Sequence, residues 1–475
     1  MSDGSTSKEN VYAVRLSTGR QRLVNILALL GLLASLVAGF LVDGPTLWGL
    51  LPIVLYAALA LLGMDINVAT LVAVLSGVLV LQPTPLAFGE LMGKAVADSI
   101  TMIGLIIMLG AGVGEVLRVT GVASTIVHGV MRLVGRRNPT AVILGIMLAS
   151  LVLVACLGTL AGALAISAPI LLPIAARLGF TRSATAAMMF IGGCAGLALA
   201  PFAGSNVAIM QAAGAGYLSY LLHGAGPLAL LSLVLGPFVV RFIQRRTEAI
   251  PAERYDAAEL TGADAETPPR ARAATAAFAV VLLASVVYAT WQGAGTSFPL
   301  IALPAIGIAT GLAGRLPVTE IAVLIYRGAA KLVPIFILFW LLAGLFLLID
   351  RLAPFEVVLA QYQTSLASSS AFVFAVIVAL LGWVGVPGAT AAQVVLLDKV
   401  FGPLAEAIGV PVSTWIVVLL FASKTDTYGP FPNGNMVGVM GLARSENLRN
   451  MLITGWLLLV PACLMYGVIM FVQTR

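Results

Sequence analysis

The chain has 475 residues, of which 60% are hydrophobic and only 10% are charged, and its mean hydropathy is +1.06. Soluble proteins carry about 25% charged residues, so the composition excludes a soluble protein and indicates an integral membrane protein. The net charge of +6 could suggest a nucleic-acid partner, but the placement of the basic residues along the chain explains it better.

Apolar runs recur along the whole chain, and each is long enough to cross a bilayer as a helix. The first run, Leu23–Val42, follows charged residues but is not followed by a small-residue cleavage site, which favours a retained span over a signal peptide. The other predicted spans are Thr46–Gly63, Ile66–Gln82, Ser99–Leu117, Ser183–Met210, Pro227–Ile243, Ala274–Gln292, Phe298–Gly314, Val333–Ile349, Ser413–Met440 and Leu452–Val472.

Two further apolar stretches, Thr140–Leu178 and Ala371–Ile408, each hold two short limbs around a glycine-rich centre. The centres read GTLAG (Gly158–Gly162) and GVPGAT (Gly385–Thr390). We interpret each stretch as a re-entrant hairpin; the alternative is two full spans per stretch, because short spans and hairpin limbs look alike in sequence. The predicted fold class is an all-α polytopic membrane protein with about 11 transmembrane helices plus two re-entrant hairpins.

A polar segment, Thr247–Arg272, interrupts the apolar pattern and is interpreted as a cytoplasmic linker that is partly mobile. If the N-terminus lies in the cytoplasm, 21 of the 26 basic residues fall on the cytoplasmic side, as the positive-inside rule requires. This placement argues against nucleic acid as a partner. We expect a multi-pass protein of a bacterial inner membrane, with the lipid bilayer as its surroundings.

Several phrases occur twice, about 230 residues apart. Leu171–Thr185 resembles Phe401–Trp415, and APFAGSNVAIM (Ala200–Met210) resembles YGPFPNGNMVGVM (Tyr428–Met440). Each copy contains an odd number of crossings, so the second copy would be inverted relative to the first, as in secondary transporters. The predicted units are a tail with an extra first helix (1–45), a first inverted repeat (46–246), a cytoplasmic linker (247–273) and a second inverted repeat (274–475).

Proline interrupts the helix in both copies, at Pro201 and Pro430. The freed backbone groups are tolerated in a membrane only where protein covers them or where they line a polar cavity. Opposed half-helix ends with neutral oxygens and amides suit a hard cation or a carboxylate. The predicted ligands are Pro201, Gly204, Ser205, Asn206, Asn433, Gly434 and Asn435, with Na⁺ expected at Ser205, Asn206, Asn433 and Asn435. Packing through small residues is the alternative.

The hairpin centres should supply the other wall of this site, through Gly158, Thr159, Gly162, Gly388, Thr390 and Gln393. The stretch SKTDTYGPF adds Lys424, Asp426 and Thr427, and ionisable residues within a span indicate function. Either Lys424 binds a substrate carboxylate while Asp426 carries the coupling ion or proton, or Lys424 replaces a cation that the first copy binds. A structural ion pair, or snorkelling to the surface, is the alternative.

The cysteines and histidines are scattered singly through the chain, which argues against a disulfide framework, a metal centre or a haem. The sequence also shows no Ser/His/Asp grouping and no acidic metal motif. We therefore expect neither an enzyme nor a bound cofactor.

The segments Ile106–Asn138 and Gly158–Gly179, together with the two hairpins and the repeat, resemble the ion transporter superfamily. Similar branches are the gluconate, lactate and C4-dicarboxylate permeases and the divalent-anion symporters. The resemblance implies an elevator-type carrier of small organic anions, usually a homodimer. We predict a secondary active transporter that moves a small organic anion, such as a carboxylate or sugar acid, coupled to H⁺ or Na⁺. The alternative is a Na⁺/H⁺ antiporter of the same superfamily.

Overall fold

The computed structural model describes residues 18–41, 44–134, 138–256, 268–292, 297–354, 356–357, 361, 370–384 and 390–475, except for the side chains of residues 18, 384 and 424–426. Within these residues every regular element is a helix, which confirms the predicted all-α class. In this part of the chain, nine helical segments are long and apolar enough to cross a bilayer, and six shorter apolar helices accompany them. The protein is therefore a polytopic membrane protein.

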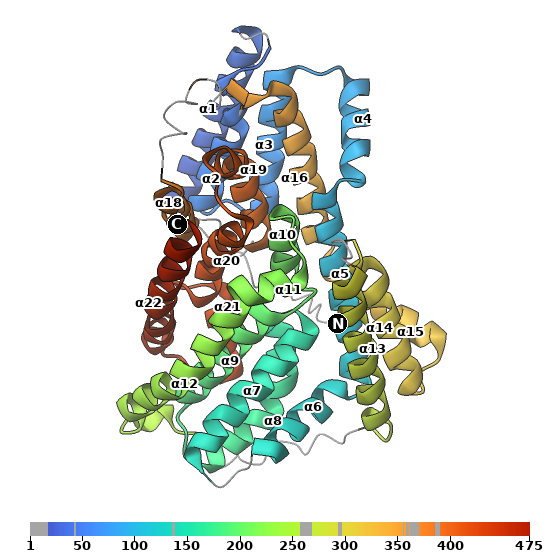
Figure 1. Ribbon diagram of the computed structural model, residues 1–475, viewed down its shortest axis with the longest axis vertical. Helices are drawn as coiled ribbons and strands as arrows, with labels where there is room; N and C mark the ends of the chain where they lie inside the picture. The colour runs from blue at the N-terminus through green and yellow to red at the C-terminus, as the bar shows by residue number, and fades with distance from the viewer. Residues whose placement is uncertain are drawn as a thin grey trace, which may run out of the picture.

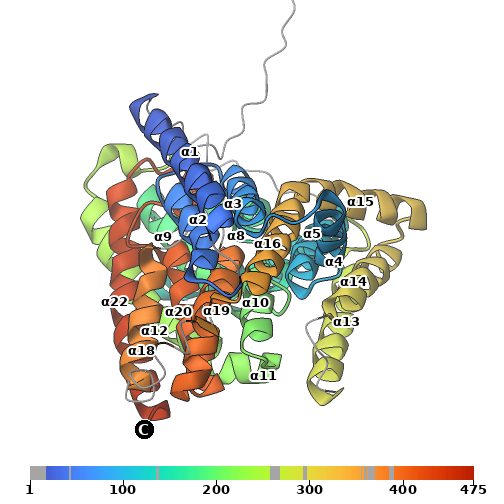
Figure 2. The ribbon, with the colours of Figure 1, turned by 90° about the horizontal axis from the view of Figure 1, so that it is seen from above.

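The first of two bundles is centred on α5 and α16, which pack against each other (Figure 1). Helix α3 packs on α16 and α14 packs on α5, while the amphipathic helices α4 and α15 lie on α16 and α5 respectively. In both views α13, α14 and α15 lie together beside α5 (Figure 2). The bundle consists of α1 (Thr18–Leu41), α2 (Leu51–Leu61), α3 (Ile66–Leu81), α4 (Pro85–Val96), α5 (Ser99–Val119), α13 (Ala271–Gln292), α14 (Pro299–Ala313), α15 (Val318–Ala330) and α16 (Val333–Leu352).

The second bundle is centred on α9 and α20. Helices α7 and α12 pack on α9, and α18, α19 and α22 pack on α20. Helix α6 (Val122–Val134) connects the bundles, and α11 (Tyr217–Tyr220) continues through a π-helical turn into α12. The other members are α7 (Pro139–Leu157), α8 (Leu160–Arg177), α9 (Arg182–Leu199), α10 (Gly204–Ala212), α12 (Gly226–Thr247), α18 (Ala371–Leu381), α19 (Thr390–Ile408), α20 (Val412–Tyr428), α21 (Gly434–Leu442) and α22 (Leu448–Gln473).

Short polar side chains mark where several helices begin. Asp98 accepts a hydrogen bond from the Ile100 amide at the start of α5, Asn138 caps α7, and Thr181 caps α9. These side chains satisfy amides that have no partner inside their own helix, which is why Asp, Asn and Thr are favoured there. The polar residues between the apolar runs therefore determine the helix boundaries.

Glycines on α9 bring it into backbone contact with α7. A Cβ at Gly192 would overlap the Met147 carbonyl, and a Cβ at Gly196 would overlap the Leu151 carbonyl. The two glycines lie four residues apart and so share one face of α9. Such small-residue faces allow close helix packing where lipid gives no hydrophobic driving force.

This packing predicts that Gly192→Ala and Gly196→Ala are each destabilised, by about 1–3 kcal/mol, because an added methyl has no space between the two backbones. The measurement is the melting temperature of the purified protein in detergent. Gly110→Ala on α5 is the matched control, since a Cβ there meets nothing within 4 Å. An unchanged melting temperature in both α9 variants would contradict the close contact.

The end of α5 lies next to the start of α16, and the end of α21 lies next to the start of α9. Lys331, just before α16, donates to Glu115 near the end of α5, with 3.3 Å between Nζ and Oε2. Ser445, just after α21, lies 3.3 Å from Ser183 at the start of α9, measured between the hydroxyl oxygens. Helices α8 and α19, α9 and α20, and α10 and α21 each start 230 residues apart, at 160 and 390, 182 and 412, and 204 and 434.

The start of the polar segment packs on the second bundle instead of extending away from it. Glu253 is buried, and its carboxylate accepts hydrogen bonds from the amide and the hydroxyl of Ser183, at 2.9 and 2.8 Å. The Tyr255 hydroxyl donates to the Ala443 carbonyl at the end of α21. This part of the predicted linker thus joins the start of α9 to the end of α21.

Candidate ion-binding site at two helix breaks

The first predicted break is confirmed: α9 ends at Leu199 and α10 starts at Gly204. The last carbonyl groups of a helix have no partner within it. Asn206, in the first turn of α10, is fully buried, and its amide nitrogen lies within hydrogen-bond distance of three carbonyls at this helix end. The acceptors are the carbonyls of Leu197 at 2.8 Å, Ala198 at 3.0 Å and Ala200 at 2.8 Å.

Two tyrosines complete this set of donors. The Tyr217 hydroxyl donates to the Leu199 carbonyl at 2.5 Å, and the Tyr220 hydroxyl donates to the Ala198 carbonyl at 2.7 Å. The last three carbonyls of α9 and that of its C-cap, Ala200, therefore each accept a hydrogen bond from a side chain. Tyr217 and Tyr220 could not be predicted from the sequence as part of this break, because they belong to a later helix, 18 and 22 residues from their acceptors.

The other predicted residues of the first break are Pro201, Gly204 and Ser205. Ser205 is buried and donates to the Asn206 side-chain oxygen at 3.3 Å. A Cβ at Gly204 would overlap the Ile107 side chain of α5, so the glycine lets the start of α10 approach the first bundle closely. Pro201 lies in the turn between the half-helices.

The second predicted break is also confirmed: α20 ends at Tyr428 and α21 starts at Gly434. Asn433 connects the two half-helices. Its side-chain oxygen accepts from the Met436 amide at 2.9 Å, and its nitrogen donates to the Thr427 carbonyl at 3.3 Å. Asn435, the second residue of α21, is half-buried.

Thr427, in the last turn of α20, is the unusual residue of the second break. It is 1% exposed, and its hydroxyl has no hydrogen-bond partner among the described residues. A buried polar group without a partner is unfavourable by about 1–3 kcal/mol, so such a group requires an explanation. An ion or water bound at this oxygen would supply one.

Each predicted hairpin lies close to the break of its own half, although α7 and α8 are both long and apolar enough to be the two full spans of the alternative interpretation. At the first hairpin, Gly158 is left-handed, with φ +68°, and a Cβ there would lie 3.6 Å from the Ala203 backbone. Thr159 and Gly162 follow at the start of α8, where a Cβ at Gly162 would approach the Thr159 hydroxyl to 2.9 Å.

The tip of the second hairpin, residues 385–389 including Gly388, lies outside the described residues. Beyond it, Thr390 starts α19, and Gln393 is buried one turn later. The Gln393 side-chain nitrogen lies 2.6 Å from the Gly382 carbonyl and 3.3 Å from the Ala422 carbonyl of α20. Gln393 therefore joins this hairpin to the helix that leads into the second break.

The short helices that follow the breaks also pack against the other half of the chain. Helix α10 packs against α19, and α21 packs against α8, so each short helix after a break contacts the hairpin of the other half. Helix α21 also packs against α9 and α22, and α10 also packs against α5 and α20. The predicted site elements thus gather in the second bundle.

Lys424 and Asp426 lie in α20, whose backbone the structure describes at these positions, but their side chains lie outside the described part. The two interpretations of this pair, functional and structural, therefore both stand. Their place along the chain is informative, because Asp426 directly precedes the buried Thr427.

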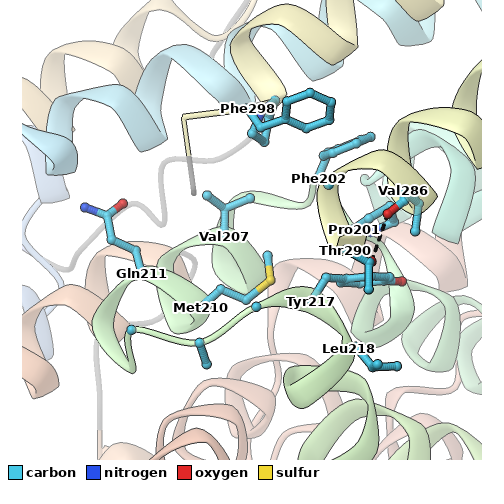
Figure 3. A pocket seen from close by; sticks show the side chains of 15 residues that line it. Pro201, Phe202, Val207, Met210, Gln211, Tyr217, Leu218, Val286, Thr290 and Phe298 are labelled. Carbon is cyan, nitrogen blue, oxygen red and sulfur yellow. Dashed lines mark hydrogen bonds between the residues drawn. The ribbon is translucent and has the colours of Figure 1, made fainter. Parts of the chain in front are cut away.

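A cavity of about 520 Å³ lies beside the first break, between α10 and α11 on one side and α13 and α14 on the other (Figure 3). Phe202, Val207 and Met210 line it from the first break, and Phe298 faces them from the second half. None of its lining residues is charged. Such a lining does not replace the hydration of an ion, which favours the breaks over this cavity as an ion site.

Comparison with known proteins agrees with a transporter. Residues 6–223 match the Na⁺/H⁺ antiporter family, and no curated protein is similar to the chain. The fold is similar to that of the YdaH transporter of Alcanivorax borkumensis, whose crystal structure was reported to reveal an unusual topology. That similarity has a TM-score of 0.60 at 15% identity and covers 94% of this chain and 98% of the other. Together, the antiporter match and the shared fold support a secondary transporter.

Proposed function

We propose that this chain exchanges Na⁺ for H⁺ across a bacterial inner membrane, with the coupling ion bound at the second break. The observation that carries this proposal is the buried hydroxyl of Thr427, which lacks a partner among the described residues at the carbonyl end of α20. The carbonyl end of a helix favours a cation. A hydroxyl, backbone carbonyls and a carboxylate are the hard oxygen ligands that Na⁺ requires.

Asp426 would make this site an exchanger. Its carboxylate can bind either a sodium ion or a proton, and one group cannot hold both at once. Proton and sodium would therefore compete for the same oxygen atoms, and each would leave on the side where the other is abundant. The family match over residues 6–223 supports this chemistry, although it ends before the second break.

The division into bundles supports an elevator mechanism for this exchange. Both breaks and both hairpins belong to the second bundle, so the whole site could move as one body against the first. We retain the two inverted repeats, the cytoplasmic N-terminus and a homodimer as parts of the proposal. The repeat is supported by the starts of α8 and α19, α9 and α20, and α10 and α21, which lie 230 residues apart, and its inversion is supported by the contact between the end of α5 and the start of α16.

Transport of a small organic anion remains a second candidate because of the geometry at the first hairpin. The starts of α8 and α10 meet where Gly158 contacts Ala203. Neither Thr159 nor Ala203 caps its helix with a side chain. Two uncapped helix N-termini favour an anion such as a carboxylate.

Reconstituted vesicles distinguish the two functions. An inward sodium gradient, with no organic anion present, should drive protons out, as reported by a pH-sensitive dye in the vesicle lumen. Proton movement that requires an added organic anion, together with sodium-dependent uptake of that anion, would support the second candidate and contradict the first.

Thr427→Val tests the assignment of the site. Valine preserves the side-chain shape but removes an oxygen ligand, so the sodium concentration for half-maximal exchange should rise about 10-fold, which corresponds to about 1.4 kcal/mol. Thr454→Val on α22 is the control, because the buried Thr454 hydroxyl already bonds the Asn450 carbonyl of its own helix at 2.9 Å. If the sodium concentration for half-maximal exchange rises equally in both variants, Thr427 is not a ligand of the ion.

A further inference from the structure

The outward face of α12 is apolar for three turns and basic at its end. Leu230, Val234 and Phe238 are spaced four residues apart and are 64%, 54% and 65% exposed. Arg241 and Arg245 follow Phe238 by three and seven residues, so they continue the same face, and both are exposed. The opposite face is buried against α9 and α22, and α12 lies on the outer side of the second bundle, away from α13–α15 (Figure 1).

Contacts within the protein fix this end of α12. The Gln244 side chain accepts from the Thr181 amide at 2.9 Å, and the hydroxyl oxygens of Thr247 and Thr181 lie 2.7 Å apart. On the outward face, Arg241 donates to the Thr140 hydroxyl at the start of α7, a neutral group that does not compensate its charge. The helix end is thus held in place while its basic face points away from the bundle.

The apolar part of this face matches one leaflet of a bilayer in length. Arg241 follows Leu230 by 11 residues, which is about 16 Å along a helix. The hydrocarbon core of a bilayer is about 30 Å thick, so one leaflet contributes about 15 Å. An acyl chain can therefore lie along the apolar residues while the headgroup of the same lipid lies beside the two arginines.

The two arginines favour lipids with a net negative charge. A guanidinium group can bind a phosphate through two parallel hydrogen bonds, and basic residues at a membrane surface attract anionic lipids. A zwitterionic lipid carries an ammonium group that opposes this attraction. Glu248, the exposed C-cap residue of α12, opposes it as well, but it is one negative charge beside two positive ones.

We propose that the outward face of α12 binds an anionic phospholipid, with one acyl chain along Leu230, Val234 and Phe238 and the phosphate at Arg241 and Arg245. This inference goes beyond the proposed exchange of Na⁺ for H⁺ and does not depend on it. Because α12 packs on α9, the lipid binds to the bundle that contains both breaks.

Native mass spectrometry of the purified full-length protein, with phosphatidylglycerol or phosphatidylethanolamine added, tests this site. The double variant Arg241→Gln, Arg245→Gln should bind its first phosphatidylglycerol about 30-fold more weakly, equivalent to about 2 kcal/mol for two arginines at a membrane surface. The double variant Arg315→Gln, Arg327→Gln is the matched control, because it removes the same charge from two exposed arginines of the first bundle. Its affinity should equal that of the wild type.

Two further variants extend the test. Glu248→Gln removes the opposing charge and should raise the affinity for phosphatidylglycerol. Arg245→Gln alone should lower it about 5-fold, and this variant decides if the double variant does not fold. Equal affinities of the wild type for the two lipids, or equal losses in the two double variants, would overturn the site. Displacement of the lipid by soluble glycerol phosphate would also overturn it, since the arginines would then bind a free anion.

Discussion

Asp426→Asn should abolish sodium-driven proton movement while leaving a folded protein in the membrane. Asparagine has nearly the same shape as aspartate, but it can neither carry a proton nor offer a negative charge to a cation. We expect the exchange rate to fall by more than about 100-fold, equivalent to about 3 kcal/mol. The measurement is lumenal pH in vesicles after a sodium gradient is imposed, at equal protein content.

Asp398→Asn is the matched control for this prediction. Asp398 is also an aspartate in an apolar helix of the second bundle, but it lies on α19, where Trp415 donates to it. It should retain most of the wild-type exchange. Full activity in Asp426→Asn, or the same loss in both variants, would show that Asp426 is a structural charge rather than the exchanging group.

Asn206→Ala should strongly destabilise the protein and eliminate transport. The change leaves the Leu197 and Ala200 carbonyls without the donor that they have in the wild type, while Ala198 retains Tyr220. Each buried carbonyl without a partner costs about 1–3 kcal/mol, so the expected loss for the two carbonyls is about 2–6 kcal/mol. The melting temperature in detergent measures the loss, and vesicle assays measure exchange by the protein that remains folded.

Two companion variants separate the amide hydrogens of Asn206 from its shape. Asn206→Asp keeps the shape but replaces the donors with a negative charge beside carbonyls, so it should be at least as damaging as alanine. Ser205→Ala removes only a hydroxyl that bonds the Asn206 oxygen at 3.3 Å, and it should have a small effect. A wild-type melting temperature in Asn206→Asp would contradict the role of the amide as a donor.

The helix breaks could be predicted from residue chemistry because their causes are local. Proline lacks the amide hydrogen that continues a helix. Accordingly, α9 ends two residues before Pro201, and α20 ends two residues before Pro430. Gly158 likewise sits in a left-handed turn between α7 and α8, a conformation that glycine adopts readily. Apolar run lengths were enough to predict the all-α membrane class.

The roles of the amides and hydroxyls at the breaks were not predictable in the same way. From the sequence, Asn206 was a predicted ligand; in the structure its nitrogen is used to cap α9, and two tyrosines from a later helix share that task. The state of the Thr427 hydroxyl, which has no hydrogen-bond partner among the described residues, also depends on contacts between distant segments.

By itself, the amino-acid sequence determined that this is a helical membrane protein with two interrupted helices, because backbone hydrogen bonding and transfer from water to lipid depend on local composition. Tertiary structure alone decided that Asn206, Tyr217 and Tyr220 satisfy the carbonyls at the end of α9. That outcome depends on whether a donor reaches a particular carbonyl, and a side chain 22 residues away can do so only after the intervening helix has folded back.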